Sequence, residues 1–162
     1  MNTHVPQYVI TMGLDEQTAM SEDAVDDLLA RREAAVLSLA HEGMPYSIPI
    51  SYGYDVDERT FFLRLVSTPE SDKRGFLDSS QTCRLVIYEE ADPIYRSVVA
   101  TGDLKGVDPA DLLPGDIAQY GNAQRPLFEV WSESKADLDI DLFVMDPEDI
   151  SGRRVDVRAD DD

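Results

Sequence analysis

The chain has few of the residues that metal sites, disulfides and hydrolytic triads require. Among its 162 residues Cys83 is the one cysteine, which excludes an internal disulfide and a multi-cysteine zinc site. His4 and His41 are the two histidines, so a Ser-His-Asp triad has few candidates. Neither G-x-G-x-x-G nor G-x-x-x-x-G-K-[ST] occurs, so any nucleotide has to bind without these glycine-rich loops.

The sequence also lacks positive charge and long apolar runs. Lys and Arg number 14 against 33 Asp and Glu, and the resulting net charge of −19 argues against nucleic-acid binding. No apolar run approaches the roughly 20 residues of a membrane span, and the N-terminus lacks a basic segment followed by a long apolar core. We therefore expect a cytoplasmic protein that binds neither nucleic acid nor membrane.

The acidic excess is spread over the whole chain, which has only three lysines. This composition is similar to that of proteins from salt-loving microbes. In a salt-rich cytoplasm, molar salt shortens the Debye length to about 3 Å and screens the repulsion between carboxylates. The alternative is an acidic surface for a basic partner, which an even distribution of charge disfavours. We therefore predict a halophilic protein whose fold loosens in low salt.

The composition supports a single folded domain. With 43% hydrophobic residues, the chain can bury a substantial core. Residues 20–155 form the predicted domain. Residues 1–19 are a lead-in without clear periodicity, and we expect residues 156–162 to be an acidic, disordered tail.

One helix is expected near the start of this domain. Ser21 is a good N-cap residue. The apolar residues that share one face of the helix after it are Val25, Leu28 and Leu29. The run at residues 34–40 could continue this helix, but turn residues follow it at 41–45 and a new strand pattern begins directly. We predict a first strand at residues 35–40.

Further strands are predicted where apolar or alternating segments lie between turn residues. They cover residues 47–54, 61–66, 82–89, 95–104 and 141–145. Pro49 cannot donate a hydrogen bond to a neighbouring strand and indicates an edge or a local break, and Gly102 suggests a bulge. Residues 108–136 are expected as short helices and loops. Short strands with small helices between them predict a β-barrel with helical additions.

The loop after Val66 gathers hydroxyl groups and positive charge in a chain that is poor in cations. Its donors are Ser67, Thr68, Ser71, Lys73 and Arg74. Ser71 can cap a short helix, and a helix start with free N–H groups, hydroxyls and cations suits a phosphate group. An exposed, charge-balanced helix explains the same residues equally well. The residue types alone therefore leave both interpretations open.

The order of these segments resembles the flavin-binding split barrels of the pyridoxamine 5′-phosphate oxidase-like family. The hairpin at residues 46–66, the polar loop and the next strand carry the resemblance, which covers about residues 20–155. In that family a Ser-Arg-Lys-type sequence holds the FMN phosphate. Lys73 matches the family lysine, Asp72 stands where an arginine is common, and Arg74 is the candidate for the missing charge.

The resemblance implies a mainly β (α+β) fold, a six-stranded split β-barrel with short flanking helices, and an FMN site shared by two subunits of a homodimer. The strand around Pro49 resembles the one whose backbone lies along the isoalloxazine ring, and Ser97 matches a polar residue that reaches the cofactor from the second subunit. The residues expected to bind FMN are Ile48, Pro49, Ile50, Ser51, Tyr52, Val66, Ser67, Thr68, Lys73, Arg74 and Ser97. No catalytic residue or metal ligand is assigned.

The function implied by the resemblance is that of an FMN-dependent oxidoreductase or flavin reductase that acts on a small molecule. The flavin would carry the redox chemistry. A flavin-binding module for storage or sensing, without turnover, is a second interpretation. A third is a split barrel that binds the deazaflavin F420 or haem, because related split barrels bind these ligands.

Overall fold

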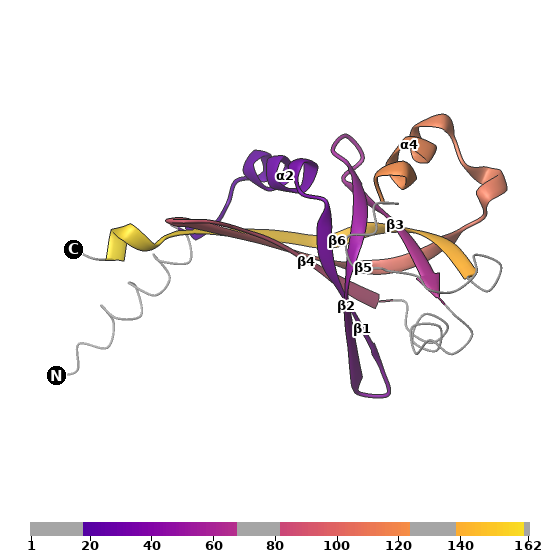
Figure 1. Cartoon of the computed structure of the whole chain (residues 1–162), viewed down its shortest axis with the longest axis horizontal. Coiled ribbons are helices and arrows are strands. Elements are labelled where there is room, and N and C mark those ends of the chain that lie inside the picture. Colours follow the sequence, from indigo (N-terminus) through magenta and orange to yellow (C-terminus); the bar gives the residue numbers. More distant parts are fainter. Residues whose placement is uncertain (1–17, 68–81, 124–138, 161–162) are drawn as a thin grey trace, which may run out of the picture.

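Six antiparallel strands form one ring in the computed structural model, which describes residues 18–67, 82–123 and 139–160 (Figure 1). The strands are β1 (Ala34–His41), β2 (Met44–Asp55), β3 (Thr60–Ser67), β4 (Thr82–Ala91), β5 (Ile94–Val107) and β6 (Asp139–Asp156). Their order around the ring is β1-β2-β3-β6-β5-β4, and β4 pairs back with β1. The predicted mainly β, six-stranded split barrel with short flanking helices is confirmed.

Two parts of the sheet extend away from the ring. The first is the arm, which consists of residues 88–91 of β4, 94–97 of β5 and 153–156 of β6, paired with one another. The second is the hairpin of β1 and β2, which projects at a steep angle to the arm (Figure 1). The sheet face that lines the core, here called the inner face, continues onto the arm, and the opposite face is called the outer face.

The helix α2 (Glu22–Arg31) lies over the inner face of the arm, between the arm and the β2–β3 end of the ring (Figure 1). It begins at Ser21 as predicted, where the side-chain oxygen accepts a hydrogen bond from the backbone N–H of Ala24 at 3.2 Å. Acidic residues in its first turn and Arg31 in its last turn complement the helix dipole. The predicted apolar side chains are the buried ones.

The run after α2 forms the strand β1, so the predicted change from helix to strand is confirmed. The side chains of Ala35, Leu37 and Leu39 are buried, whereas those between them are more exposed. This period of two places one side of β1 in the core. A helix over the same residues would have placed Leu37 on the face opposite Ala35 and Leu39.

The core contains a cluster of three aromatic rings. The ring centroid of Phe61 lies 5.8 Å from that of Tyr52 and 4.8 Å from that of Tyr54. The Tyr52 hydroxyl donates to the backbone carbonyl of Leu29, and the Tyr54 hydroxyl donates to the carboxylate of Asp26, each at 2.7 Å. Burial raises the pKa of both phenols, that of Tyr54 to about 12, so both donate at neutral pH. These bonds fix α2 to β2.

The last strand is much longer than predicted. The sequence predicts a strand at residues 141–145, whereas β6 has 18 residues. The register between β5 and β6 shifts after Thr101, which lies opposite Asp149, while Gly102 lies opposite Pro147. The bulge suggested at Gly102 is therefore confirmed, with the extra residue in β6. The predicted length is wrong because a proline among acidic residues resembles a strand end, yet a bulge accommodates it.

Short helices complete the described part of the chain. The 3-10 helix η1 (Pro109–Asp111) and the helix α4 (Pro114–Asn122) occupy the region expected to hold short helices, whose remainder lies outside the described residues. A 3-10 helix, η3 (Val157–Asp160), follows β6 in the segment expected as a tail. No helix among the described residues is long and apolar enough to cross a membrane.

The helix α4 packs on the outside of β2 and β3. The ring of Tyr120 meets that of Phe62 edge-on, with centroids 5.3 Å apart, and its hydroxyl donates to the backbone carbonyl of Phe143 at 3.0 Å. At Gly53 the backbones of α4 and the sheet lie so close that a Cβ atom there would be 2.4 Å from the backbone oxygen of Gln119. Glycine at this position therefore sets the distance between α4 and the sheet.

Replacing Gly53 with alanine is expected to lower the free energy of unfolding by about 1–3 kcal/mol, because backbone atoms of α4 must move. Gly121→Ala is the matched control within α4, since a Cβ atom at Gly121 meets nothing within 4 Å. That variant should be neutral or slightly stabilising. Urea unfolding of both variants in high salt makes the comparison, and equal effects would contradict the proposed close approach.

Candidate functional site

The wall of the barrel is interrupted between β2 and β3. These strands pair with each other from Tyr52 to Asp55. Over residues 44–51, β2 pairs only with β1 among the described strands, and over residues 64–67, β3 pairs only with β6. Pro49 lies in this one-sided part of β2, as predicted for an edge position. The two strand segments predicted to bind a cofactor therefore flank one split.

An apolar surface runs from this split across the outer face of four strands. Residues directly opposite each other in neighbouring antiparallel strands point to the same face. Pro49 of β2 lies opposite Val36 of β1, Val36 lies opposite Val86 of β4, and Val86 lies opposite Val99 of β5. A row of four apolar side chains therefore crosses the outer face without a charged residue.

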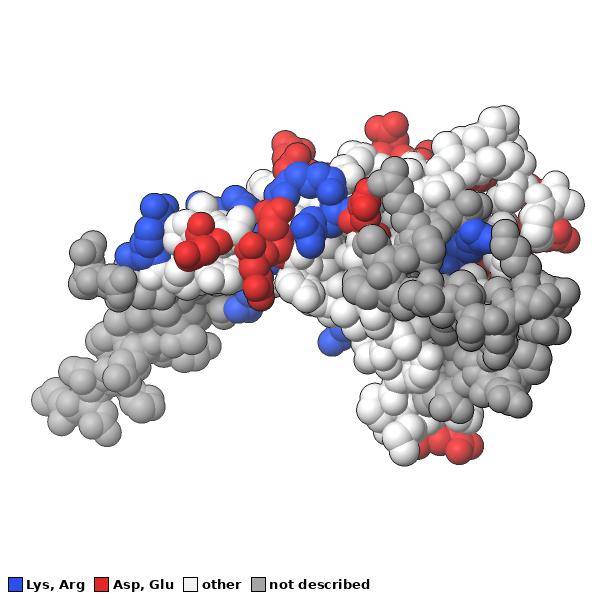
Figure 2. All heavy atoms as spheres, viewed as in Figure 1, with Lys and Arg blue, Asp and Glu red and all other residues white. Residues whose placement is uncertain are grey.

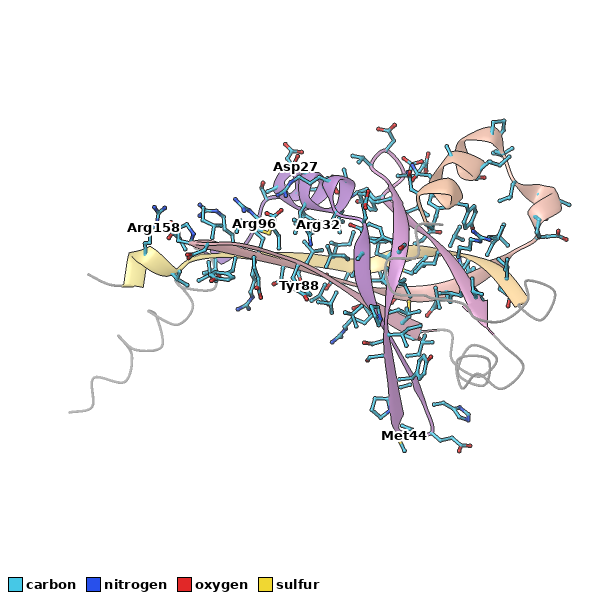
Figure 3. All side chains as sticks on the ribbon, in the orientation of Figure 1. Asp27, Arg32, Met44, Tyr88, Arg96 and Arg158 are labelled. Atoms are coloured by element: carbon cyan, nitrogen blue, oxygen red, sulfur yellow. The ribbon has the colours of Figure 1, made fainter. Side chains whose placement is uncertain are left out.

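An open pocket of about 220 Å³ lies on this surface. Its lining includes Arg32, Ala34, Val36, Pro49, Val86 and Tyr88. The side chain of Tyr88 is 53% exposed and points away from the side of the sheet that carries α2 (Figure 3). In Figure 2 the described surface of the recess between the arm and the hairpin is mostly uncharged, with individual Lys or Arg side chains at its border. An exposed aromatic ring among aliphatic side chains forms a surface that a planar ligand or another protein can cover.

The predicted site residues of β2 divide between the two faces of the strand. Ile50 and Tyr52 are buried in the core, and Ile48 packs against it. Pro49 and Ser51 alternate with them and point to the outer face. The side chains of the first three residues cannot contact a ligand on the outer face. Their backbone groups, which the family resemblance implicates, remain the part that can.

The second side of the split is the end of β3. The half-buried Val66 and the last strand residue, Ser67, lie here. The other predicted phosphate-binding residues, Thr68, Lys73 and Arg74, lie outside the described residues. In the sequence, these three residues follow within seven positions of Ser67.

Ser97 lies on the outer face but far from β2 of the same chain. It is opposite Tyr88 in β4 and Arg153 in β6. Three strand-to-strand steps separate β5 from β2, which corresponds to about 14 Å across the sheet. A single chain therefore does not place Ser97 and Pro49 around one small ring.

A protein-family model described as pyridoxamine 5′-phosphate oxidase matches residues 21–154. The chain belongs to the pyridoxamine 5′-phosphate oxidase-like family. The match includes α2, the split and nearly all of β6. Comparison with curated protein sequences gives no significant match.

Several solved structures have the same fold as this chain over most of the length of both chains. An FAD-binding protein from Mesorhizobium loti has a TM-score of 0.65 at 20% identity, covering 85% of this chain and 96% of its own. An FAD-binding protein from Mycobacterium smegmatis gives 0.59 at 18% identity, with coverages of 86% and 98%. A haem storage protein from Vibrio cholerae gives 0.60 at 15% identity, with coverages of 82% and 94%. At these identities the likeness shows the fold alone.

Of the seven residues that line the pocket in this pyridoxamine 5′-phosphate oxidase-like protein, only Pro49 is in the predicted site. The six that sequence reasoning missed are Arg32, Ala34, Ala35, Val36, Val86 and Tyr88. The sequence contains a signal for Val86 and Tyr88, because β4 has apolar side chains on both faces. Cys83, Leu85 and Ile87 fill the core, whereas Val86 and Tyr88 lie on the outer face. Val86 and Tyr88 thus give β4 an apolar stretch on its outer face as well as on its inner face.

Cys83 takes no part in this surface. Its side chain is buried in the core, and burial raises the pKa of its thiol to about 12. Since the thiolate is the reactive form, the group is inert at neutral pH. The interpretation of Cys83 as a small strand residue is confirmed.

Proposed function

We propose that this protein is a homodimer that binds FMN at the split between β2 and β3 and acts as an oxidoreductase or flavin reductase on a small molecule. The observation that carries the proposal is the apolar outer face beside the split. An isoalloxazine ring has two apolar faces and a polar edge. Pro49, Val36 and Val86 offer apolar contact, and the backbone of β2 offers hydrogen-bonding groups.

The family and its structural neighbours support a flavin as the ligand. Two proteins of similar fold, from Mesorhizobium loti and Mycobacterium smegmatis, are FAD-binding proteins. We favour FMN because Lys73 follows the split at the position where the FMN-binding members resembled by this chain carry their phosphate-binding lysine. A terminal phosphate monoester is doubly charged, and a lysine near a helix start suits it.

The outer face also supports a second copy of the chain as the partner. Tyr88, Tyr95 and Val155 are 53%, 37% and 39% exposed. Tyr95 lies opposite Val155 and two residues from Ser97, so the apolar surface extends along the outer face of the arm. A symmetric copy against this face would bury these side chains. It would also bring its own Ser97 to the β2 strand of the first chain.

The bound flavin would supply the redox chemistry of the reaction. The chain itself would bind and orient that group. Lys73 would hold the phosphate, the backbone of β2 would align the ring, and Val86 and Tyr88 would exclude water from one side. The small-molecule substrate would then meet the exposed face of the ring at the subunit boundary.

A storage role and a haem ligand place different demands on the site. A flavin storage or sensing module would use the same site without turnover. Haem would require an axial ligand, and His41 is the one histidine within the described ranges. It lies exposed at the end of β1, about 16 Å along the strand from Val36. The described part of the chain therefore favours a flavin over a histidine-ligated haem.

The absorption spectrum of the purified protein tests this proposal. We expect the two visible bands of an oxidised flavin, which a reductant bleaches and a suitable acceptor restores. The single long-wavelength band of a deazaflavin or the intense Soret band of haem would overturn FMN as the ligand. A bound flavin that no electron donor reduces would indicate storage or sensing.

A further inference from the structure

A second pocket lies on the opposite side of the arm from the proposed flavin site. It has a volume of about 380 Å³, within the range of small-molecule sites. Its lining includes Ser21, Ala24, Asp27, Arg31, Arg96 and Arg154, and we call it the arginine pocket. It lies between α2 and the inner face of the arm. In Figure 3, Asp27 and Arg96 are on the side of the sheet that carries α2, and Tyr88 is on the other side.

Two arginines of this pocket face each other across neighbouring strands. Arg96 of β5 lies directly opposite Arg154 of β6, and like charges in such positions repel. On its other side, Arg96 pairs with Glu89, with 3.2 Å between Nη1 and Oε1. Arg154 makes no hydrogen bond or ion pair with any described residue, and it acts on Asp156 only through a weaker charge interaction.

The carboxylates near the pocket are already engaged by another arginine. Arg31 of α2 pairs with Glu89 through Nη1 and with Asp27 through Nε, the latter at 3.0 Å. The hydrogen bond from Arg31 holds the pKa of Glu89 below its usual range, so this carboxylate is ionised at neutral pH. Glu89 and Asp27 thus balance Arg31 and Arg96. Among the described residues this leaves the exposed Arg154 without a paired carboxylate.

This surplus positive charge stands out in a chain with a net charge of −19. Lys and Arg side chains gather along α2 and the arm (Figure 2). Arg31 has a structural role, because its ion pair with Glu89 fixes α2 to the arm. Arg96 has one as well, because it pairs with the same carboxylate. Such a role does not account for Arg154, whose side chain bonds to no other helix or strand in the described part of the chain.

We propose that the arginine pocket binds the carboxylate of a small organic acid. A guanidinium group presents a planar fork of donors that matches a carboxylate, and Arg96 with Arg154 would supply two such forks from one wall. The Ser21 hydroxyl lies in the same lining. One negative charge would offset Arg154 and relieve its repulsion with Arg96. A dianion would be disfavoured by the carboxylates of Asp27 and Glu89.

Titration of the full chain with benzoate at constant ionic strength, followed by backbone amide NMR, tests this proposal. We expect saturable shifts in residues 19–31 and around Arg96 and Arg154. Arg154→Gln should weaken benzoate binding about tenfold or more, because it removes one charged fork. Arg154→Lys, which keeps the charge but not the fork, should fall between that variant and the unmodified protein.

Arg158→Gln is the matched control, because it removes the same charge near the same end of β6 from a residue outside the pocket lining. It should change benzoate affinity by less than about twofold, since an exposed charge outside the site is largely screened. FMN affinity should be the same in both variants, which separates this pocket from the proposed flavin site. Equal weakening in both variants, no saturable binding, or tighter binding of inorganic phosphate than of benzoate would each overturn the proposal.

Discussion

Replacing Lys73 with alanine is expected to weaken FMN binding by a factor of tens or more while riboflavin binding scarcely changes. Removing one charged hydrogen-bonding partner of a desolvated phosphate costs on the order of 2–5 kcal/mol of binding free energy. This cost corresponds to a loss of FMN affinity by a factor of tens or more. Riboflavin has the same ring but no phosphate. Fluorescence titration of both ligands in high salt measures the difference directly.

The chain offers a matched control for this experiment. Lys105 is one of the three lysines, and its side chain is exposed on β5. Lys105→Ala should leave both affinities unchanged. Equal losses for FMN and riboflavin in the Lys73 variant would show that this lysine supports the fold or the ring. Unchanged FMN affinity would remove Lys73 from the site. The next residues to test would then be Arg74 and Arg64, the latter in the part of β3 that flanks the split.

Replacing Val86 with aspartate is expected to dissociate the dimer and to abolish tight FMN binding together. Val86 is central in the apolar row that links Pro49 to β5, and it lines the pocket on the outer face. A carboxylate there would lose its hydration without gaining a partner when the second chain docks. Such a cost raises the dissociation constant of the dimer by about a hundredfold or more.

Val56→Asp introduces the same change at a place that the proposed interface does not use. Val56 is 44% exposed and lies between β2 and β3, beyond the strand ends at Asp55 and Thr60. This control should remain dimeric and should bind FMN as the unmodified protein does. Sedimentation velocity in molar salt compares the two variants. A Val86 variant that stays dimeric and keeps its flavin would exclude the outer face as the interface.

The elements that local sequence could predict are those whose signals lie within a few residues. The N-cap at Ser21 and the apolar spacing after it define α2, and the alternation at residues 35–40 defines β1. Gly102 indicated a bulge because a glycine within a strand pattern often marks one, and the register shift between β5 and β6 lies there. In each case one short segment contains the necessary information.

The features that could not be predicted from the sequence are those that depend on pairing between distant segments. The 18-residue length of β6 follows from its long register with β5, which continues past Pro147 only because a bulge absorbs the proline. The pocket on the outer face depends on the contact between β1 and β4, which brings Val36 opposite Val86. Residue types along either strand do not determine which partner strand it meets.

The sequence predicted only the part of the candidate site that lies on β2 and β3, because the rest depends on which strands pair. Alternation along β2 distinguishes core side chains from outward ones, and Ile50 and Tyr52 do lie in the core. Their inclusion among the expected cofactor-binding residues followed from the family's use of that strand's backbone. The surface that adjoins Pro49 comes from β1 and β4, so predicting it requires knowing which strands pair in the ring.

Sedimentation of the unmodified protein in molar salt, with simultaneous detection of protein and flavin absorbance, shows whether two chains share the flavin site. We expect one boundary at the mass of a dimer, carrying FMN at one molecule per chain, and loss of bound flavin as dilution produces monomers. A monomer that sediments with tightly bound FMN would contradict the shared site, and a dimer that binds no flavin under any condition would contradict the proposed function.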